Sequence, residues 1–303
     1  MEMQLLMIVL PVFLIFGAGY IAQKILKMDI KSVSALSLYI LLPILTFNTF
    51  YTNDITMDYF HLFTFTLIIT AILGGVTIVI GYFLKADREE MAAMLLGTLF
   101  PNSGNYGSPV VLFAISATAF DYAIVLMVLH GFLISTIGIF IASFGTGALI
   151  TVREAIVNVF KIPVIYGALA GILLQVFDVT VGDKLMEMSE MTGDAAIPVV
   201  MLILGMQLAQ ITKEKFKMKN ITAVTIVRMI IAPLVAAVLV LFMPVDDTMK
   251  MVFIILNAMP VAANSTMLAV QFNVKPNLVS FSTLVTTLIS LITIPICLYL
   301  IGI

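Results

Sequence analysis

The sequence predicts an all-α polytopic membrane protein with ten transmembrane helices, arranged as two inverted repeats of five helices each. Three observations lead to this fold class: an apolar composition, charged residues that alternate between the two sides of the membrane, and a Pro/Asn segment that occurs once in each half. Of the 303 residues, 62% are hydrophobic and only 11% are charged. Because soluble domains carry about 25% charged residues, this composition excludes an ordinary soluble enzyme.

Ten apolar runs are long enough to cross a bilayer as helices, for which roughly 17 to 25 residues are needed. Their predicted limits are residues 4–23, 32–50, 60–84, 91–116, 121–147, 162–178, 193–211, 221–243, 249–272 and 278–301. Glu2 precedes the first run and Lys24, Lys27 and Lys31 follow it, which is the reverse of the charge order in a signal peptide. We therefore expect the first span to be retained.

The basic residues give the predicted orientation of these spans. The connections after spans 1, 3, 5, 7 and 9 contain 12 of the 15 Lys and Arg residues. The opposite side has only Lys184 and Lys250, and Arg228 lies inside span 8. Since basic connections remain in the cytoplasm, we expect a multi-pass protein of the cell membrane with both termini outside. The alternation also supports ten spans, because one span more or fewer would disrupt it.

The two halves of the chain match each other in their prolines. Pro43 in span 2 corresponds to Pro198 in span 7, a shift of 155 residues. We therefore divide the chain into a first five-helix repeat, residues 1–150, and a second one, residues 151–303, with a linker around 148–161. Because each repeat has an odd number of spans, the second is inverted relative to the first.

The most informative similarity between the halves is a segment that interrupts spans 4 and 9. It reads FPNSGNY at residues 100–106 and MPVAANS at residues 259–265, and its proline and its last asparagine align in the two copies. Backbone groups freed by such a break cannot face lipid, so breaks of this kind survive only around a polar cavity. Matching breaks in two halves are the best sequence indication of a transporter binding site.

Both breaks are expected at the membrane midplane, where the discontinuous helices 4 and 9 would cross. After Pro101 we expect an extended segment and a new half-helix near Pro109, because proline removes a donor but suits a first helical turn. In span 9 we expect residues 260–264 to be extended and Ser265-Thr266 to open and cap the next half-helix. The residues assigned to the breaks are Pro101, Gly104, Gly107, Pro109 and Pro260.

Two crossing half-helices would bring their N-termini together, an arrangement that favours an anion. Neighbouring amides and hydroxyls can add neutral hydrogen bonds to a carboxylate. The candidate substrate-binding residues are Asn102, Ser103, Asn105, Asn264, Ser265, Thr266 and Gln207. A second interpretation is that the prolines and glycines are kinks and the amides only join helices. It fits a single copy better than two aligned copies.

Four further polar residues lie inside the predicted spans. Arg228 is either a substrate counter-charge or a side chain that reaches the cytoplasmic interface, and its place near one end of span 8 favours the interface. His130 is either a proton relay or a structural hydrogen-bond partner, which is commoner for a single histidine. Asn48 and Asn257 either contact substrate or bridge helices, and we favour bridging.

The sequence predicts no catalytic residue, no metal site and no cofactor. No Asp or Glu lies at mid-membrane, where a coupling acid would be expected. The single cysteine, Cys297, provides neither a disulfide framework nor a thiol metal site. Coupling to a proton or to sodium would therefore use amide, hydroxyl or carbonyl oxygens, or the proton of the substrate itself.

The two breaks resemble those of the auxin efflux carrier family, whose bacterial members are described as malate or malonate permeases. Residues 101–103 and 107–109 read PNS and GSP, similar to P-N-T-x-x-x-G-x-P in the fourth span of the plant members. Residues 259–260 and 272–276 read MP and FNVKP, similar to their ninth-span L-P…Y-N-V-x-P. Ser265 stands where the plant proteins have a second proline. The length resembles that of the short prokaryotic branch.

The resemblance implies a scaffold domain of spans 1, 2, 6 and 7, often with a dimer contact, and a transport domain of spans 3–5 and 8–10. We therefore expect a secondary active transporter that carries a small organic acid anion, a mono- or dicarboxylate, by an elevator-type mechanism. The expected partners are this substrate, the lipid bilayer and a second copy of the chain, and no nucleic acid. The alternatives are a sodium-coupled symporter of the bile-acid-transporter type, a membrane-embedded enzyme and a passive channel.

Overall fold

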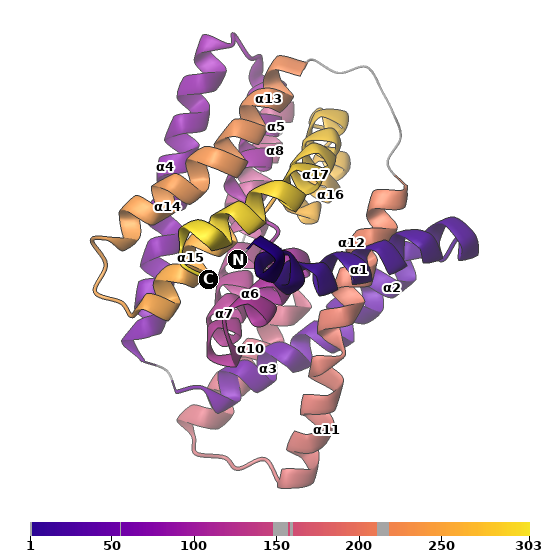
Figure 1. Cartoon of the computed structure of the whole chain (residues 1–303), viewed down its shortest axis with the longest axis vertical. Coiled ribbons are helices and arrows are strands. Elements are labelled where there is room, and N and C mark those ends of the chain that lie inside the picture. Colours follow the sequence, from indigo (N-terminus) through magenta and orange to yellow (C-terminus); the bar gives the residue numbers. More distant parts are fainter. Residues whose placement is uncertain (1, 55, 148–156, 158–159, 211–217) are drawn as a thin grey trace.

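The computed structural model describes residues 2–54, 56–147, 157, 160–210 and 218–303, with side chains from Leu10 onward. Throughout these ranges the regular structure is helical, apart from one isolated β-bridge (Figure 1). Most of the linker expected around 148–161, and part of the lysine-rich connection after span 7, lie outside the described residues.

Six helical stretches in the described part of the chain are individually long and apolar enough to cross a membrane. The first three are Ile30–Thr52 (α2, Ile30–Leu36; η1, Ser37–Leu41; α3, Leu42–Thr52), α4 (Met57–Phe83) and Ala117–Thr146 (α7, Ala117–Leu133; η3, Ile134–Gly138; α8, Ile139–Thr146). The other three are Asp183–Ala209 (α11, Asp183–Asp194; α12, Ala196–Ala209), Met218–Val240 (α13, Met218–Ile226; η4, Val227–Ile231; α14, Ala232–Val240) and α17 (Pro276–Leu300). Two shorter apolar stretches are Leu10–Leu26 of α1 (Glu2–Leu26) and α10 (Pro163–Val176).

The remaining helices are the two interrupted ones. The first is α5 (Arg88–Leu99), followed by η2 (Ser103–Gly107) and α6 (Ser108–Ala114). The second is α15 (Asp247–Asn257), followed by α16 (Ala263–Gln271). Since α5 has 12 residues and α15 has 11, neither is long enough alone to cross a bilayer, which takes about 20 residues. Each therefore depends on the segment beyond its break.

Both interrupted helices begin at an aspartate that caps them. Asp87 accepts a hydrogen bond from the backbone N–H of Glu90, and the Glu90 side chain accepts one from the backbone N–H of Asp87 in return. Asp246 accepts from the N–H of Met249 at 2.8 Å. Such caps satisfy donors that an exposed first turn would leave free.

Of the four wide π-turns among the described residues, three end two positions before a proline. The turns η1, η2 and η4 are each followed by an α-helix whose second residue is proline, namely Pro43, Pro109 or Pro233. Proline has no N–H to donate to the carbonyl four residues earlier. A π-turn, in which hydrogen bonds run from i to i+5, allows the helix to continue past this missing donor.

Two pairs of helices cross at unusually close range, and both crossings depend on glycine. Helices α1 and α12 pack along each other, with Gly19 against the carbonyl of Leu202 and Gly205 against that of Phe16. Helices α3 and α10 do the same, with Gly167 against the carbonyl of Pro43. A Cβ atom at Gly205 or Gly167 would lie 2.0 Å from the opposing carbonyl oxygen. These positions therefore require glycine because the backbones touch.

The molecule consists of two neighbouring groups of helices. One group contains α1, α2, α3, α10, α11 and α12, and it occupies the lower and right-hand part of Figure 1. The other contains α4, α5, α8 and α13–α17, with α6 and α7 between the two groups near the centre. The break after α5 and the break after α15 therefore lie close to the boundary between the groups.

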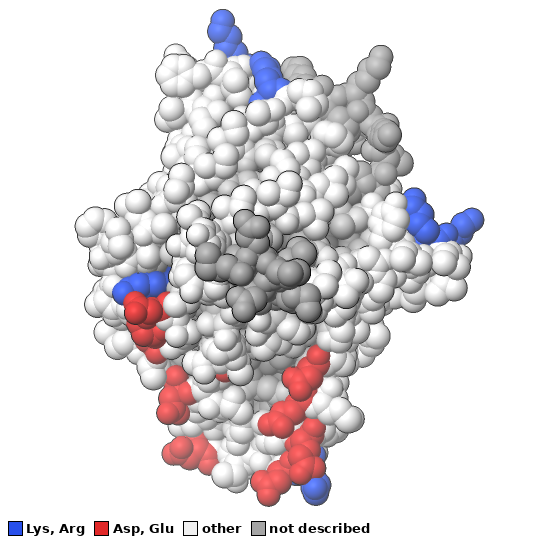
Figure 2. Space-filling model, viewed as in Figure 1, with Lys and Arg blue, Asp and Glu red and all other residues white. Residues whose placement is uncertain are grey.

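The charges are separated along the long axis of the molecule. On the face shown in Figure 2, acidic side chains gather toward the end that carries α11, and most basic ones lie toward the opposite end. The surface between them on this face is largely uncharged. Many large apolar side chains of the described residues are exposed, such as Leu14, Phe60, Phe140, Leu234 and Ile292. An apolar belt between two charged ends is the surface that a bilayer requires.

The close crossing of α1 and α12 leads to a stability prediction. A Cβ at Gly19 would lie 2.2 Å from the Leu202 carbonyl oxygen, so Gly19→Ala should lower the apparent melting temperature in detergent and cost about 1–3 kcal/mol. Gly17→Ala is the matched control, because a Cβ there meets nothing within 4 Å. Equal melting temperatures for the two variants would contradict this account of the crossing.

Candidate functional site

The centre of the site is a direct contact between the two helix breaks. The N–H of Asn102 donates to the carbonyl of Pro260 at 2.8 Å, and the N–H of Ala262 donates to the carbonyl of Phe100 at 3.0 Å. Together they form an antiparallel bridge between Pro101 and Val261. Neither proline has an N–H, so each break begins with a residue that cannot continue its helix. One N–H of each break is therefore satisfied by a carbonyl of the other break.

The first break is shorter than the sequence predicted. A new half-helix was expected near Pro109, but helical structure resumes at Ser103 with η2. The N–H of Gly107 donates to the Asn102 carbonyl at 2.9 Å, which closes the wide turn. Gly107 also lies against α15, where a Cβ would approach the Leu256 side chain to 2.5 Å. The α-helix α6 does begin at Ser108, with Pro109 in its first turn, as expected. Only the extended segment before it was wrong, because the π-turn η2 accommodates the missing donor of Pro109 while remaining helical.

The second break is also shorter, and its cap differs from the prediction. Only residues 260–262 are extended, and α16 begins at Ala263 after Ala262, which provides no side-chain cap. Asn264 therefore lies in the first turn rather than in the extended segment. Ser265 and Thr266 do not cap the helix: the Ser265 hydroxyl is fully buried without a hydrogen-bond partner, and the Thr266 hydroxyl lies 3.1 Å from that of Thr283 on α17.

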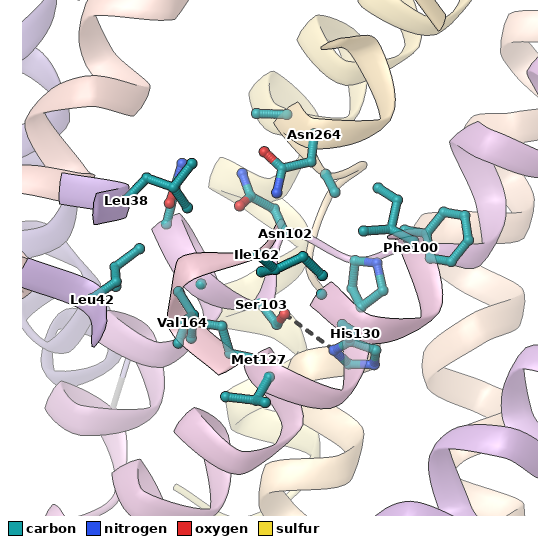
Figure 3. A pocket seen from close by; sticks show the side chains of 18 of the residues that line it. Leu38, Leu42, Phe100, Asn102, Ser103, Met127, His130, Ile162, Val164 and Asn264 are labelled. Carbon is teal, nitrogen blue, oxygen red and sulfur yellow. Dashed lines mark hydrogen bonds between the residues drawn. The ribbon is translucent and has the colours of Figure 1, made fainter. Parts of the chain in front are cut away.

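A cavity of about 110 Å³ lies against the paired breaks (Figure 3). A single water needs about 10–15 Å³ by this measure, so the cavity has room for several waters or a small solute. Residues of both breaks line it, together with residues of α7, η3, η1, α3 and the start of α10. The lining residues are Leu38, Leu42, Phe100, Pro101, Asn102, Ser103, Gly104, Asn105, Met127, Val128, His130, Gly131, Ile134, Ile162, Val164, Ile165, Ala262, Ala263 and Asn264.

The polar groups of the cavity come almost entirely from the two breaks. The side chains of Asn102 and Asn264 face each other in Figure 3, and the Asn102 amide nitrogen is buried without a hydrogen-bond partner. Asn105 adds a half-buried amide. An unpaired buried amide costs roughly 1–3 kcal/mol. Because Asn102 belongs to the cavity wall, this unpaired donor lies beside the space that a solute would occupy.

His130 joins the first break to α7. Its Nδ1 atom lies 3.1 Å from the Ser103 hydroxyl, and both side chains are buried in the cavity wall. The structural hydrogen bond that the sequence favoured for this histidine is therefore present. His130 also lines the cavity, so it is in a position to contact a bound solute. The sequence alone did not include it among the substrate-binding residues.

The cavity contains no charged side chain among its lining residues. Its electrostatic character comes from backbone groups, since η2 with α6 and α16 both start at the cavity. The first N–H groups of a helix are unpaired and carry about half a positive charge in total. This arrangement suits an anion that must bind and be released.

Three of the predicted substrate-binding residues lie outside this lining. Ser265 and Thr266 belong to α16 and contact the interior of the α16–α17 pair instead. Gln207 is half-buried on α12 and is not part of the cavity wall. The structure brings Asn102, Ser103, Asn105 and Asn264 together, and the break prolines Pro101 and Pro260 hold the backbone pairing beside them.

Arg228 corrects a further expectation. It does not reach the cytoplasmic interface but is fully buried, and its guanidinium group donates to backbone carbonyls of both interrupted helices. The side chain remains inside because those carbonyls provide the hydrogen bonds that water would otherwise supply. An arginine inside an apolar span was the sequence signal for this role, but the sequence did not indicate its acceptors.

Asn48 bridges two helices through its side chain, as predicted, whereas Asn257 is joined to η4 mainly through its backbone carbonyl and its amide nitrogen donates to Phe253 within α15. The Asn48 side-chain oxygen accepts from the Ser189 hydroxyl at 2.8 Å, which joins α3 to α11. The carbonyl of Asn257 at the end of α15 accepts from Arg228 on η4 at 2.5 Å. Neither residue lines the cavity.

Comparison with known proteins gives the family. A family profile described as "Membrane transport protein" matches residues 4–298, which is nearly the whole chain. The chain belongs to the auxin efflux carrier family. This auxin efflux carrier family member is therefore a membrane transport protein, and the resemblance in its two breaks is confirmed. No curated protein matches its sequence.

Thiol labelling can test the boundaries of the cavity without any substrate. In a Cys297→Ala background, which removes the single cysteine, Asn264→Cys and Asn105→Cys should react with a methanethiosulfonate reagent. Ser265→Cys should react more slowly by roughly tenfold or more, because that position is fully buried. Mass spectrometry of the purified protein gives the rates. Fast labelling at residue 265 would contradict the cavity boundary.

Proposed function

We propose that this protein is a secondary active transporter of a small organic acid anion, which binds between the two helix breaks. The observation that carries this proposal is the cavity beside the Pro101–Val261 bridge, with its unpaired Asn102 amide and two helix starts. Buried donors without acceptors favour a ligand that brings acceptors, and carboxylate oxygens do so. Membership of a membrane transport family supports the same conclusion.

The proposed architecture is ten transmembrane helices in two inverted five-helix repeats, residues 1–150 and 151–303. Six long helices, two shorter ones and two interrupted ones together match this number. The proposed scaffold of spans 1, 2, 6 and 7 corresponds to the group in which α1 pairs with α12 and α3 pairs with α10. The proposed transport domain, spans 3–5 and 8–10, would carry the crossing helices 4 and 9 past this scaffold in an elevator-type movement.

The walls of the cavity favour an acid with one carboxylate and an apolar remainder. The wall formed by the breaks carries the amides, whereas the wall formed by η1, α3 and the start of α10 is apolar, with Leu38, Leu42 and Ile162 (Figure 3). A second carboxylate facing the apolar wall would lose its hydration without gaining hydrogen bonds. We therefore favour a monocarboxylate over a dicarboxylate such as malate or malonate.

For the cellular setting we propose the cell membrane, with both termini outside and a homodimer as the assembly. The separation of acidic and basic ends supports a fixed orientation. Sodium coupling is a separate question. Uptake into proteoliposomes in sodium and in potassium buffers at the same pH distinguishes a sodium-coupled symporter from a carrier that uses protons or none.

The two aligned asparagines are the first test of the site. Asn105→Ala and Asn264→Ala should each raise the KM for uptake of the transported acid roughly tenfold or more, because a hydrogen bond to a charged group contributes about 1.5–3 kcal/mol. Asn48→Ala is the matched control, since its amide binds Ser189 away from the cavity. Uptake by the Asn105→Ala/Asn264→Ala double variant at the wild-type rate would refute the site.

The choice between one carboxylate and two can be tested with acids of equal chain length. Butyrate should raise the melting temperature of the purified protein more than succinate does, because a ligand stabilises the folded state according to its affinity. The same comparison should be repeated with Ile162→Asn, which adds a polar group to the apolar wall and should reduce the difference. A larger shift with succinate in the wild type would refute the monocarboxylate preference.

A further inference from the structure

Arg228 is the largest fully buried side chain in the described part of the protein, and it lies on the π-turn η4 beside both interrupted helices. Its Nη1 atom donates to the carbonyl of Thr98 at 3.0 Å, near the end of α5. Its Nη2 atom donates to the carbonyl of Asn257, the last residue of α15, at 2.5 Å, and Nε donates to that of Met259, two residues beyond, at 3.1 Å. One side chain therefore holds the ends of two helices from opposite halves of the chain.

The acceptors of Arg228 exist because the helices break. In an uninterrupted helix the Thr98 carbonyl would accept from the N–H of Asn102, but that N–H donates to Pro260 across the break. The Asn257 carbonyl would accept from the N–H of Val261. That N–H instead donates to the hydroxyl of Thr286 on α17 at 3.2 Å. Each break thus leaves one backbone carbonyl without its helical donor, and Arg228 donates a hydrogen bond to both carbonyls.

The charge of Arg228 is balanced by helix ends rather than by an acid. The ion pairs found among the described residues are all at the surface, and none includes Arg228. The carbonyl ends of α5 and α15 carry the negative end of the helix dipole, so a cation between them is favoured. Replacing it by a neutral group would leave buried carbonyls unpaired, which is costly in a membrane.

We propose that Arg228 is a positioning residue that couples the two breaks, so that the paired strands and the cavity depend on its three hydrogen bonds. It does not line the cavity itself, and each of its three nitrogen atoms donates to a backbone carbonyl. Arg228 therefore acts on a bound anion through the backbone of residues 98–104 and 257–263. In this respect the inference extends the proposed function, but its geometry does not depend on transport.

Lysine cannot replace arginine in this position. The guanidinium group has a planar fork of donors that reaches three carbonyls at fixed angles, whereas an ammonium group is a compact point of charge on a flexible stem. Arg228→Lys therefore keeps the charge and removes the coupling, and Arg228→Met removes both. Comparing them separates the role of the charge from that of the fork.

Hydrogen–deuterium exchange of the purified protein, without substrate, tests the coupling. In Arg228→Lys, peptides that cover residues 98–104 and 257–263 should both exchange at least about tenfold faster than in the wild type, while α4 peptides remain unchanged. The matched control is Thr286→Val, which removes the hydroxyl that accepts from the Val261 N–H and otherwise donates only within α17, to the carbonyls of Ser282 and Thr283. It should accelerate exchange in residues 257–263 alone. Arg228→Met should behave like Arg228→Lys, and Arg228→Lys decides the matter if the methionine variant does not fold.

Three results would overturn the proposal: unchanged exchange at both breaks, faster exchange at one break only, or equally faster exchange throughout the protein. The last would mean that Arg228 stabilises the fold in general. The outcome is separate from that of the proposed function. Faster exchange at both breaks in a protein that takes up no carboxylate would refute the transport proposal alone, and normal exchange in an active transporter would refute the role of Arg228 alone.

Discussion

The pairing of the two helix breaks is the interaction on which the rest of this structure depends. A membrane-spanning helix can be interrupted only if the released N–H and C=O groups find partners inside the protein. Here Asn102 and Ala262 donate across the gap to Pro260 and Phe100, so each break supplies the partners of the other. Neither break could persist alone. This mutual requirement gives a physical reason for the occurrence of the Pro/Asn segment once in each half of the chain.

The remaining groups at the breaks are satisfied by neighbouring helices rather than by water. Arg228 donates hydrogen bonds to the carbonyls of Thr98 and Asn257, and the Thr286 hydroxyl accepts one from the Val261 N–H. The Asn102 amide nitrogen is left without a partner and faces the cavity. An unpaired donor in a residue of the cavity wall favours a ligand that brings an acceptor. The neutral lining of the cavity also limits how strongly an anion is held, which favours release.

The helices could be predicted from the sequence because long apolar runs and charged connections are strong signals in a membrane protein. The existence of the breaks could also be predicted, since Pro101 and Pro260 are conspicuous in apolar surroundings. Their ends could not, because Ser103 and Ala263 start new helical turns only where the partner break satisfies the backbone. Arg228 was misjudged for a related reason. Its partners are carbonyls, which every residue has, so no sequence pattern marks them.

The glycine crossings have a consequence for how this protein can be studied. Where Gly205 meets Phe16 and Gly167 meets Pro43, backbone touches backbone, and no layer of side chains is present that could change rotamer and allow sliding. The helices α1, α12, α3 and α10 are therefore fixed to each other in pairs. Spectroscopic labels placed along these pairs would form an internal frame of reference, against which displacements of the paired breaks can be measured in ångströms.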